Sequence, residues 1–271
     1  MKQMGLKFTV LSSGSTGNAT VVSDGDVTLM IDAGFSARRI DELLCEREVD
    51  GHQLAGILIT HEHSDHIKGL GAVSRKFNLP IYANEGTWAA MEKSIGKIPE
   101  ENIRVFASGA SKDFGSLRVQ SFEISHDAAA PVGYCFEDGK HKLSVCTDLG
   151  YASDKVKAAI VDSDVLVLEA NHDIEMLRMG RYPWNTKRRI LGDLGHLSNE
   201  ATGELMSELL NGRLKRTYLA HLSREHNMPD LAKMSVRGSM EDRGCFYRDS
   251  EFKLCDTYYD RPTPWDIVGA I

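Results

Sequence analysis

Short apolar runs of β-strand length, each bounded by turn residues, dominate the first half of the chain. They lie at residues 8–11, 20–22, 27–31, 56–60 and 117–124. Apolar residues at helical spacing lie between and after these runs, at residues 37–48, 69–77, 87–94, 153–159 and 199–210. Strands and helices that alternate along the whole chain predict an α/β fold built in layers.

The sequence shows no division into separate parts. It contains no internal repeat, no low-complexity tract and no linker rich in Pro, Gly or Ser, so we expect residues 1–271 to form a single domain. Two segments are less regular than the rest. Residues 12–18 (Ser-Ser-Gly-Ser-Thr-Gly-Asn) predict a turn-rich connection, and residues 234–271 carry the least clear pattern.

Composition and charge restrict the class of protein. The chain is 42% hydrophobic and 26% charged, as in ordinary globular proteins. Its formal net charge of −7 provides no overall positive field, which lowers the expectation of nucleic-acid binding without excluding it. The five cysteines are scattered and odd in number, which favours reduced thiols. With no signal-peptide pattern at the start, we expect a cytoplasmic protein that does not enter a membrane.

A dense group of metal-ligand side chains follows the apolar run at 56–60. Its sequence is His-Glu-His-Ser-Asp-His, so His61, His63, Asp65 and His66 lie within six positions. Alternate side chains of an extended segment share a face, so His61 and His63 can point at one cation while Asp65 and His66 turn towards a second. Imidazole and carboxylate donors suit zinc, manganese or iron. A polar loop without metal is the weaker alternative, because protonated histidines gathered there would repel one another.

Three later apolar strands also end on a ligand-type residue. The runs at 119–124, 143–146 and 217–220 lead into His126, Asp148 and His221, respectively. A strand-terminal Asp is more often a turn or a helix cap, and an isolated His is more often a core group. Several such strand ends at one edge of a sheet would nevertheless complete a site for two metals.

With these motifs in place, the chain resembles the metallo-β-lactamase superfamily, whose His-x-His-x-Asp-His motif stands at 61–66. The resemblance implies an αβ/βα sandwich of two mixed sheets with helices on the outer faces. It also implies one metal held by His61, His63 and His126, and a second held by Asp65, His66 and His221, with Asp148 bridging both. Asp32 matches the family's early strand-end Asp, which orients a metal-bound imidazole instead of binding the metal.

Further motifs bear on the substrate. The segment 195–202 opens a helix at Ser198 and resembles the His motif of the phosphodiesterase branch, which implies that His196 donates a proton to the leaving oxygen or stabilises charge on the phosphate. Residues 12–18, 169–173 and 195–199 together resemble the bacterial YycJ/WalJ exonuclease-like proteins, which act on DNA from 5′ to 3′. That family places Asn where His226 stands, and His221 is the better ligand candidate because it directly ends a strand.

The segment between Asp148 and His221 is too short to add the large cap domain of the β-CASP nucleases. It contains a basic stretch with aromatic residues at 178–189, which can pair with phosphates and stack on unpaired bases, although charge runs are usually solvated surfaces. The substrate-binding candidates are Asn18, Asn171, Arg181, Tyr182, Lys187 and Arg188.

The resulting hypothesis is a two-metal phosphodiesterase, a DNA exonuclease of DNA repair or metabolism. Asp65 would ligate one metal and steer the proton of the nucleophile, and His196 would assist the departing oxygen. Mn²⁺ and Zn²⁺ both accept this donor set, and Fe is less favoured. The alternatives are hydrolysis of RNA or a small cyclic phosphodiester, a carbonyl-directed hydrolase acting on thioesters or lactams, a non-catalytic nucleic-acid adaptor, and an oxygen-reducing diiron protein.

Overall fold

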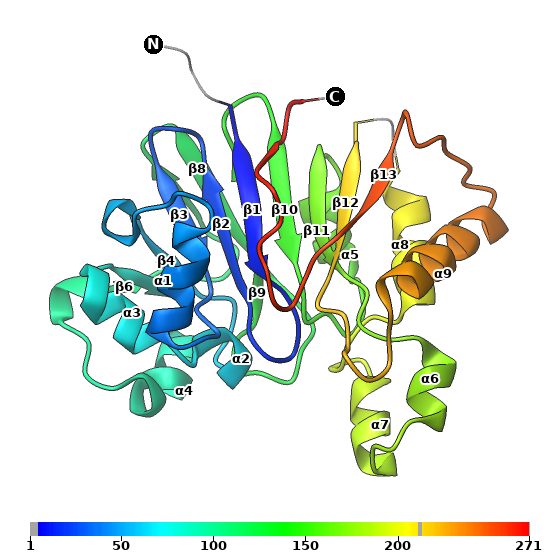
Figure 1. The fold of residues 1–271 in the computed structure, drawn as a ribbon, viewed down its shortest axis with the longest axis horizontal. Coiled ribbons are helices and arrows are strands. Elements are labelled where there is room, and N and C mark those ends of the chain that lie inside the picture. The colour runs from blue at the N-terminus through cyan, green and yellow to red at the C-terminus, as the bar shows by residue number, and fades with distance from the viewer. Residues whose placement is uncertain (1–4, 211–212, 271) are drawn as a thin grey trace.

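A computed structural model describes residues 5–210 and 213–270 of the chain, and in it the strands form two mixed sheets (Figure 1). The first sheet has seven strands in the order β14 (Asp266–Ile267), β1 (Lys7–Ser12), β2 (Ala19–Ser23), β3 (Thr28–Ile31), β4 (Gly56–Leu58), β5 (Ile81–Ala83) and β6 (Ile103–Val105). The second, also of seven strands, has the order β13 (Lys253–Asp256), β12 (Arg216–Ala220), β11 (Val165–Glu169), β10 (Lys142–Cys146), β9 (Val132–Glu137), β8 (Leu117–Glu123) and β7 (Ser111–Phe114).

Helices cover the outer face of each sheet. The first sheet carries α1 (Ala37–Cys45), α3 (Leu70–Phe77) and α4 (Glu85–Ile95), and the second carries α5 (Asp154–Ile160), α8 (Asn199–Leu209) and α9 (Pro229–Asp242). The short α2 (Ser64–Ile67), α6 (Ile174–Met179) and α7 (Trp184–Ile190) lie at one end of the strands, at the bottom of Figure 1. Single turns of 3₁₀ helix occur at Gly51–Gln53 and Glu100–Asn102.

Three apolar layers hold this arrangement together. Between the sheets, side chains such as Phe8 and Phe136 are fully buried. A second layer joins the first sheet to α1, α3 and α4, and a third joins the second sheet to α5, α8 and α9. Because both faces of the central strands are covered, β2 and β11 are buried at every position, whereas β8, nearer the edge of its sheet, alternates between buried and exposed residues. The predicted αβ/βα sandwich is therefore confirmed.

The predicted elements are present with small shifts of their ends, and several others were not foreseen. The strand predicted at 56–60 ends at Leu58, and the four positions from Ser64 form α2 where a loop was expected. The strands not predicted include β5, β6, β7, β9 and β11. The tail with the least clear pattern contains most of α9, together with β13 and β14.

Strand direction determines where functional side chains can meet. In the first sheet β3 and β4 run parallel, and in the second β10, β11 and β12 run parallel. Strand β8 has the same direction as β10, because both pair antiparallel with β9. The carboxyl ends of all these strands therefore lie at the same edge of the two sheets, beside α2, α6 and α7.

Candidate metal centre

The backbone turns sharply where three of these strands end. Asp32, Asp148 and His221 follow β3, β10 and β12, and each has a positive φ, of 58°, 59° and 55°, respectively. This left-handed conformation is uncommon for residues other than glycine and is strained most often at functional sites. All three residues therefore stand just past the carboxyl ends of strands, in a backbone conformation that does not continue the strand.

The ligand-type side chains converge at this edge in overlapping groups. His61, His63 and His126 form one group in which one ring nitrogen of each lies within 4.8 Å of the others, and Asp65, His66 and His221 form a second by the same measure. Asp148 lies between the groups: its Oδ2 is 3.3 Å from His66 Nε2 and its Oδ1 is 3.8 Å from His126 Nε2. The geometry thus brings together all seven side chains that the sequence singled out.

Hydrogen bonds at the outer nitrogen fix how the rings face the centre. The Nδ1 of His126 lies 3.0 Å from the Gly195 carbonyl, and the Nδ1 of His61 lies 3.0 Å from the Thr60 hydroxyl. His63 is turned the other way, with its Nε2 3.2 Å from the Asp127 carbonyl. Such contacts select the tautomer and leave the opposite ring nitrogen for a metal. His63 therefore offers Nδ1 where its neighbours offer Nε2.

Asp32 supports the centre from behind. Its Oδ2 lies 2.7 Å from His66 Nδ1 and accepts a hydrogen bond from the Thr60 hydroxyl at 2.8 Å, while its Oδ1 accepts one from the Thr60 amide at 2.9 Å. Asp32 is only 3% exposed and belongs to neither ligand group. It thus occupies the orienting position that the resemblance implied.

Glu169, which the sequence analysis did not assign, is the second buried carboxylate behind the centre. Its Oε1 lies 2.8 Å from His196 Nδ1 and 3.1 Å from His221 Nδ1. Its Oε2 accepts hydrogen bonds from the amides of Leu149 and Leu197 at 2.8 and 3.1 Å. The signal that would have found it is the same as for Asp148: an apolar run, here β11, that ends on a carboxylate.

Two buried atoms of the clustered side chains lack the hydrogen bonds that burial normally requires. Within the described residues, neither His61 Nε2 nor Asp148 Oδ2 makes a hydrogen bond, although both are inaccessible to solvent. Buried polar atoms without partners are rare and costly, so their presence at the centre fits a cation that would complete them. Nitrogen and carboxylate donors of this kind suit Zn²⁺ or Mn²⁺.

Neighbouring charges and burial shift the pKa values of the proposed ligands in different directions. Burial, together with the nearby imidazoles of His66 and His126, lowers the pKa of His61 well below its ordinary value. Despite burial, the imidazoles of His221 and His66 lower the pKa of Asp148. Burial likewise opposes charge on His221, but the Asp148 carboxylate and other acidic neighbours raise the pKa of His221 to about 10. A divalent ion would displace that proton, since metal binding and proton release are coupled.

A cavity of about 280 Å³ opens over the centre. Of the substrate-binding candidates, Asn171 and Tyr182 line it, as does His196. Asn171 also donates a hydrogen bond to the His221 carbonyl at 2.8 Å, so it supports the ligand loop. Arg189, which was not among the candidates, lines the same cavity.

The basic substrate-binding candidates, Arg181, Lys187 and Arg188, do not line the cavity. Lys187 is buried and donates a hydrogen bond to the Arg178 carbonyl at 2.6 Å, which corrects its proposed role as a phosphate contact. The orientation of α7 explains why Arg189 and not Lys187 lines the cavity. Thr186, Arg189 and Ile190 share the helix face that lines it. Arg181 and Arg188 are exposed and lie outside the cavity lining.

Asn18 also differs from its predicted role. It is only 7% exposed; its amide group lies 3.1 Å from His66 Nε2, and its backbone N–H donates to the Asp65 carbonyl at 2.8 Å. The close approach of this loop to Asp65 also requires glycine at Gly34, because a Cβ there would lie 1.8 Å from the backbone carbonyl oxygen of Asp65. Asn18 therefore fixes the ligand loop and does not face a substrate.

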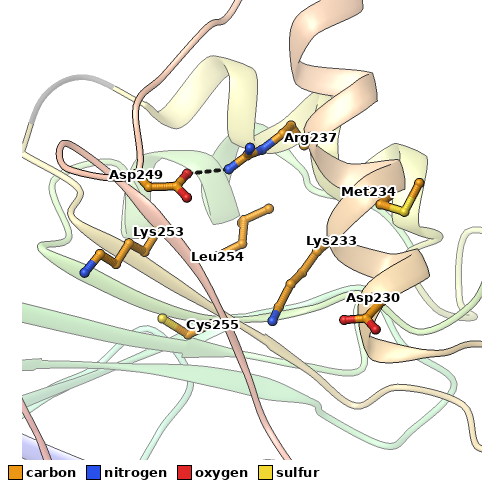
Figure 2. A pocket seen from close by; sticks show the side chains of 8 residues that line it. All are labelled: Asp230, Lys233, Met234, Arg237, Asp249, Lys253, Leu254 and Cys255. Carbon is orange, nitrogen blue, oxygen red and sulfur yellow. Dashed lines mark hydrogen bonds and ion pairs between the residues drawn. The ribbon is translucent and has the colours of Figure 1, made fainter.

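A larger cavity, of about 670 Å³, lies between α9 and β13 (Figure 2). Its cations are mostly engaged with carboxylates: Arg237 pairs with Asp249 at 2.6 Å and Lys233 with Asp256 at 2.6 Å. Its lining contains none of the clustered ligand side chains. The chemistry of the lining, and not the size of the cavity, therefore identifies the functional edge.

Two further findings concern the expected setting of the protein. In the described part of the chain, no helix combines the length and apolar character needed to cross a bilayer. All five cysteines, Cys45, Cys135, Cys146, Cys245 and Cys255, are free thiols.

Known proteins resemble this chain over most of its length. A family model described as Beta-lactamase superfamily domain matches residues 28–222. The Exodeoxyribonuclease YycJ of Bacillus anthracis is 48% identical over 98% of this chain and 100% of its own length. The Exodeoxyribonuclease WalJ of Streptococcus pneumoniae is 43% identical over 97% of this chain and 98% of its own. Among solved structures, the metallo-beta-lactamase fold protein YhfI from Bacillus subtilis superposes with a TM-score of 0.71 at 16% identity, covering 95% of this chain and 98% of YhfI.

Proposed function

Because this chain belongs to the beta-lactamase superfamily, we propose that it is a metal-dependent hydrolase of DNA phosphodiester bonds, an exonuclease acting from the 5′ end. The hydrolytic chemistry rests on one observation, the two groups of ligand atoms that meet at Asp148. The choice of DNA rests on the two relatives named exodeoxyribonuclease, which match nearly the whole chain.

The proposed ligand set divides into two triads and a bridge. His61, His63 and His126 would hold one divalent ion, and Asp65, His66 and His221 the other, with Asp148 shared between them. Mn²⁺ and Zn²⁺ are the ions that we propose, since imidazole and carboxylate donors accept both. Bound ions would activate a water molecule and neutralise charge on the phosphate oxygens.

The protein's own groups would manage the protons. Asp65 is 20% exposed at its side chain and lines the cavity, so its carboxylate can accept a hydrogen bond from an attacking water and steer the proton of that water. His196 also lines the cavity, and its Nδ1 is engaged by Glu169. Its Nε2 is therefore the atom that would donate a proton to the departing oxygen.

The surroundings of the site fit a charged polymer better than a small neutral substrate. Arg189 projects from α7 into the cavity lining, and its side chain is 55% exposed. Arg181 and Arg188 add exposed positive charge on the same protruding segment. The free thiols support a further proposal, that the protein works in the reducing cytoplasm.

The decisive experiment is digestion of end-labelled nucleic acids by protein reconstituted with Mn²⁺ or Zn²⁺. Single- and double-stranded DNA and RNA, each labelled at the 5′ or the 3′ end, are compared. We expect release of labelled mononucleotides from 5′-labelled DNA first, and progressively shorter fragments from 3′-labelled DNA. Degradation of RNA alone, degradation from 3′ ends alone, or turnover only of thioesters or lactams would contradict the proposal.

The matched variants are Asp148→Ala and His63→Ala, each with metal content measured alongside. Both should lose DNA hydrolysis, because the first removes the bridging carboxylate and the second a ligand of the first triad. Lys155→Ala, which removes an exposed lysine paired with Glu123, serves as the control and should remain active. Full activity in Asp148→Ala protein would refute the site.

A further inference from the structure

One aromatic side chain in the cavity lining is held against a buried histidine ring. Tyr182, which precedes α7, lines the cavity together with His63 and His196. Its ring meets that of His226 edge to face, with centroids 4.5 Å apart and planes at 70°. Burial and the nearby Glu225 carboxylate raise the pKa of Tyr182, so the ring is a neutral phenol. The contact with His226 thus holds the orientation of the ring.

His226 is itself locked between two parts of the chain. It is only 2% exposed, its backbone N–H donates to Ser223 Oγ at 3.2 Å, and its carbonyl accepts a hydrogen bond from the Asp173 amide at 2.9 Å. A Cβ at Gly180 would lie 2.1 Å from His226 Nε2, so glycine is needed for the ring to fit. His226 belongs to none of the groups of ligand-type side chains among the described residues, so its role is structural and not metal binding.

The loop that carries His226 begins at a member of the ligand groups. His221 starts this loop, and its backbone N–H donates to Ser13 Oγ at 2.8 Å. A short, anchored connection therefore sets the position of His226, and through it that of Tyr182, relative to the metal centre. Arg189 lines the same cavity as Tyr182. Its guanidinium pairs with Asp127, which directly follows His126.

An aromatic ring held beside a cation and a hydrolytic centre matches how proteins bind single strands. Aromatic side chains stack on bases, which adds affinity for the base, and cations contact the backbone phosphates. We infer that Tyr182 is a stacking platform for the terminal base of the bound strand and that His226 is the positioning residue that holds it there. The inference rests on the proposed function, since it names the part of the DNA substrate that Tyr182 contacts.

The test compares two ligands that differ only in the base. Calorimetric binding of thymidine 5′-monophosphate and of 2-deoxyribose 5-phosphate to the metal-reconstituted protein gives a base preference, the ratio of the two Kd values. We expect the nucleotide to bind about tenfold more tightly, within the range that stacking supplies. Equal affinities in the wild-type protein would overturn the inference.

Variants assign the preference to named residues. Tyr182→Leu should bring the ratio close to one with little change in affinity for the sugar phosphate, whereas Tyr182→Phe, which keeps the ring, should retain it. His226→Ala should lower the ratio several-fold, and His226→Phe, which keeps a flat buried ring, should restore most of it. A ratio unchanged in Tyr182→Leu, or both ligands weakened equally in His226→Ala, would contradict the respective assignment.

This test separates the inference from the proposed function. A protein that shows the base preference but hydrolyses no DNA would remove the proposed nuclease activity and leave the stacking site in place. A protein that degrades DNA but shows no Tyr182-dependent preference would do the reverse. Thermal unfolding of each variant checks that a lost preference does not reflect a lost fold.

Discussion

The Oε1 atom of Glu169 lies 2.8 Å from the Nδ1 atom of His196, deep behind the metal centre. Despite burial, which opposes its charge, the Glu169 carboxylate raises the pKa of His196. The same oxygen lies 3.1 Å from His221 Nδ1, so a single carboxylate orients a proposed ligand and a proposed proton donor. This shared contact links metal binding to proton transfer.

Replacement of Glu169 should therefore impair both functions. In Glu169→Gln the charge is lost while the size is kept, and we expect metal affinity and kcat to fall by about 10- to 100-fold, as for other groups that orient metal-bound histidines. Glu123→Gln, which alters an exposed carboxylate paired with Lys155, is the matched control. Metal titration and steady-state kinetics report the two effects, and unchanged values in both would exclude an orienting role.

Metal binding should stabilise the fold. His61 Nε2 and Asp148 Oδ2 make no hydrogen bond within the described residues and would be coordinated by a bound cation, so metal binding should add to the free energy of unfolding. At a metal concentration 100 times Kd the gain is about 2.7 kcal/mol for each site. For a chain of this size the Tm should rise by about 5–10 °C for one site.

A differential scanning measurement on chelator-treated protein, with and without added Mn²⁺, tests this rise. His61→Asn should reduce it, whereas His52→Asn should not, because His52 is exposed and belongs to no ligand group. An equal rise in both variants would show that the metal stabilises the protein from another place.

Arg189, and not its neighbour Arg188, should contact the substrate backbone. Arg189 lines the cavity and Arg188 lies on the exposed face of α7. In Arg189→Met we expect the KM for DNA to rise about tenfold and the slope of log Kobs against log salt to flatten by about 0.7 for a single strand. Arg188→Met should change KM less than twofold. Kinetics at several salt concentrations measure both effects. A larger rise in KM for Arg188→Met than for Arg189→Met would place the bound strand on the exposed face of α7.

Acid should destabilise the protein through His172. Its ring is buried, with Nε2 lacking a hydrogen-bond partner among the described residues, and burial lowers the pKa of His172 to about 4. Above its unfolded pKa of about 6.5 the ring is neutral in both states. As the pH falls from there towards 4, only the unfolded chain gains a proton, so the free energy of unfolding decreases, by about 2 kcal/mol at pH 5.

Urea unfolding of the metal-free protein near pH 7.5 and near pH 5 measures this loss. The variant His172→Phe, which keeps a buried ring without a titrating group, should lose less stability over the same interval. The difference between the two proteins isolates His172 from the other titrating histidines. An identical loss in both would show that His172 does not titrate as described.

The sequence by itself determined the layered α/β class and predicted the side chains that the fold brings together in the proposed metal centre. His61, His63, Asp65 and His66 are visible because a ligand loop that follows one strand must carry its donors close together in the chain. Asp148 and His221 are visible because each stands within two residues of the end of an apolar run. Strand ends of this kind are local features, so they need no knowledge of distant contacts.

Tertiary structure decided the roles that depend on neighbours. Parallel pairing places β11 between β10 and β12, so its last residue, Glu169, lies beside the ends that carry Asp148 and His221. The packing of α7 turns Arg189 into the cavity and buries Lys187, although both are cations in the same basic stretch. Residue type shows what a side chain can do, but strand order and helix phase fix which groups it meets.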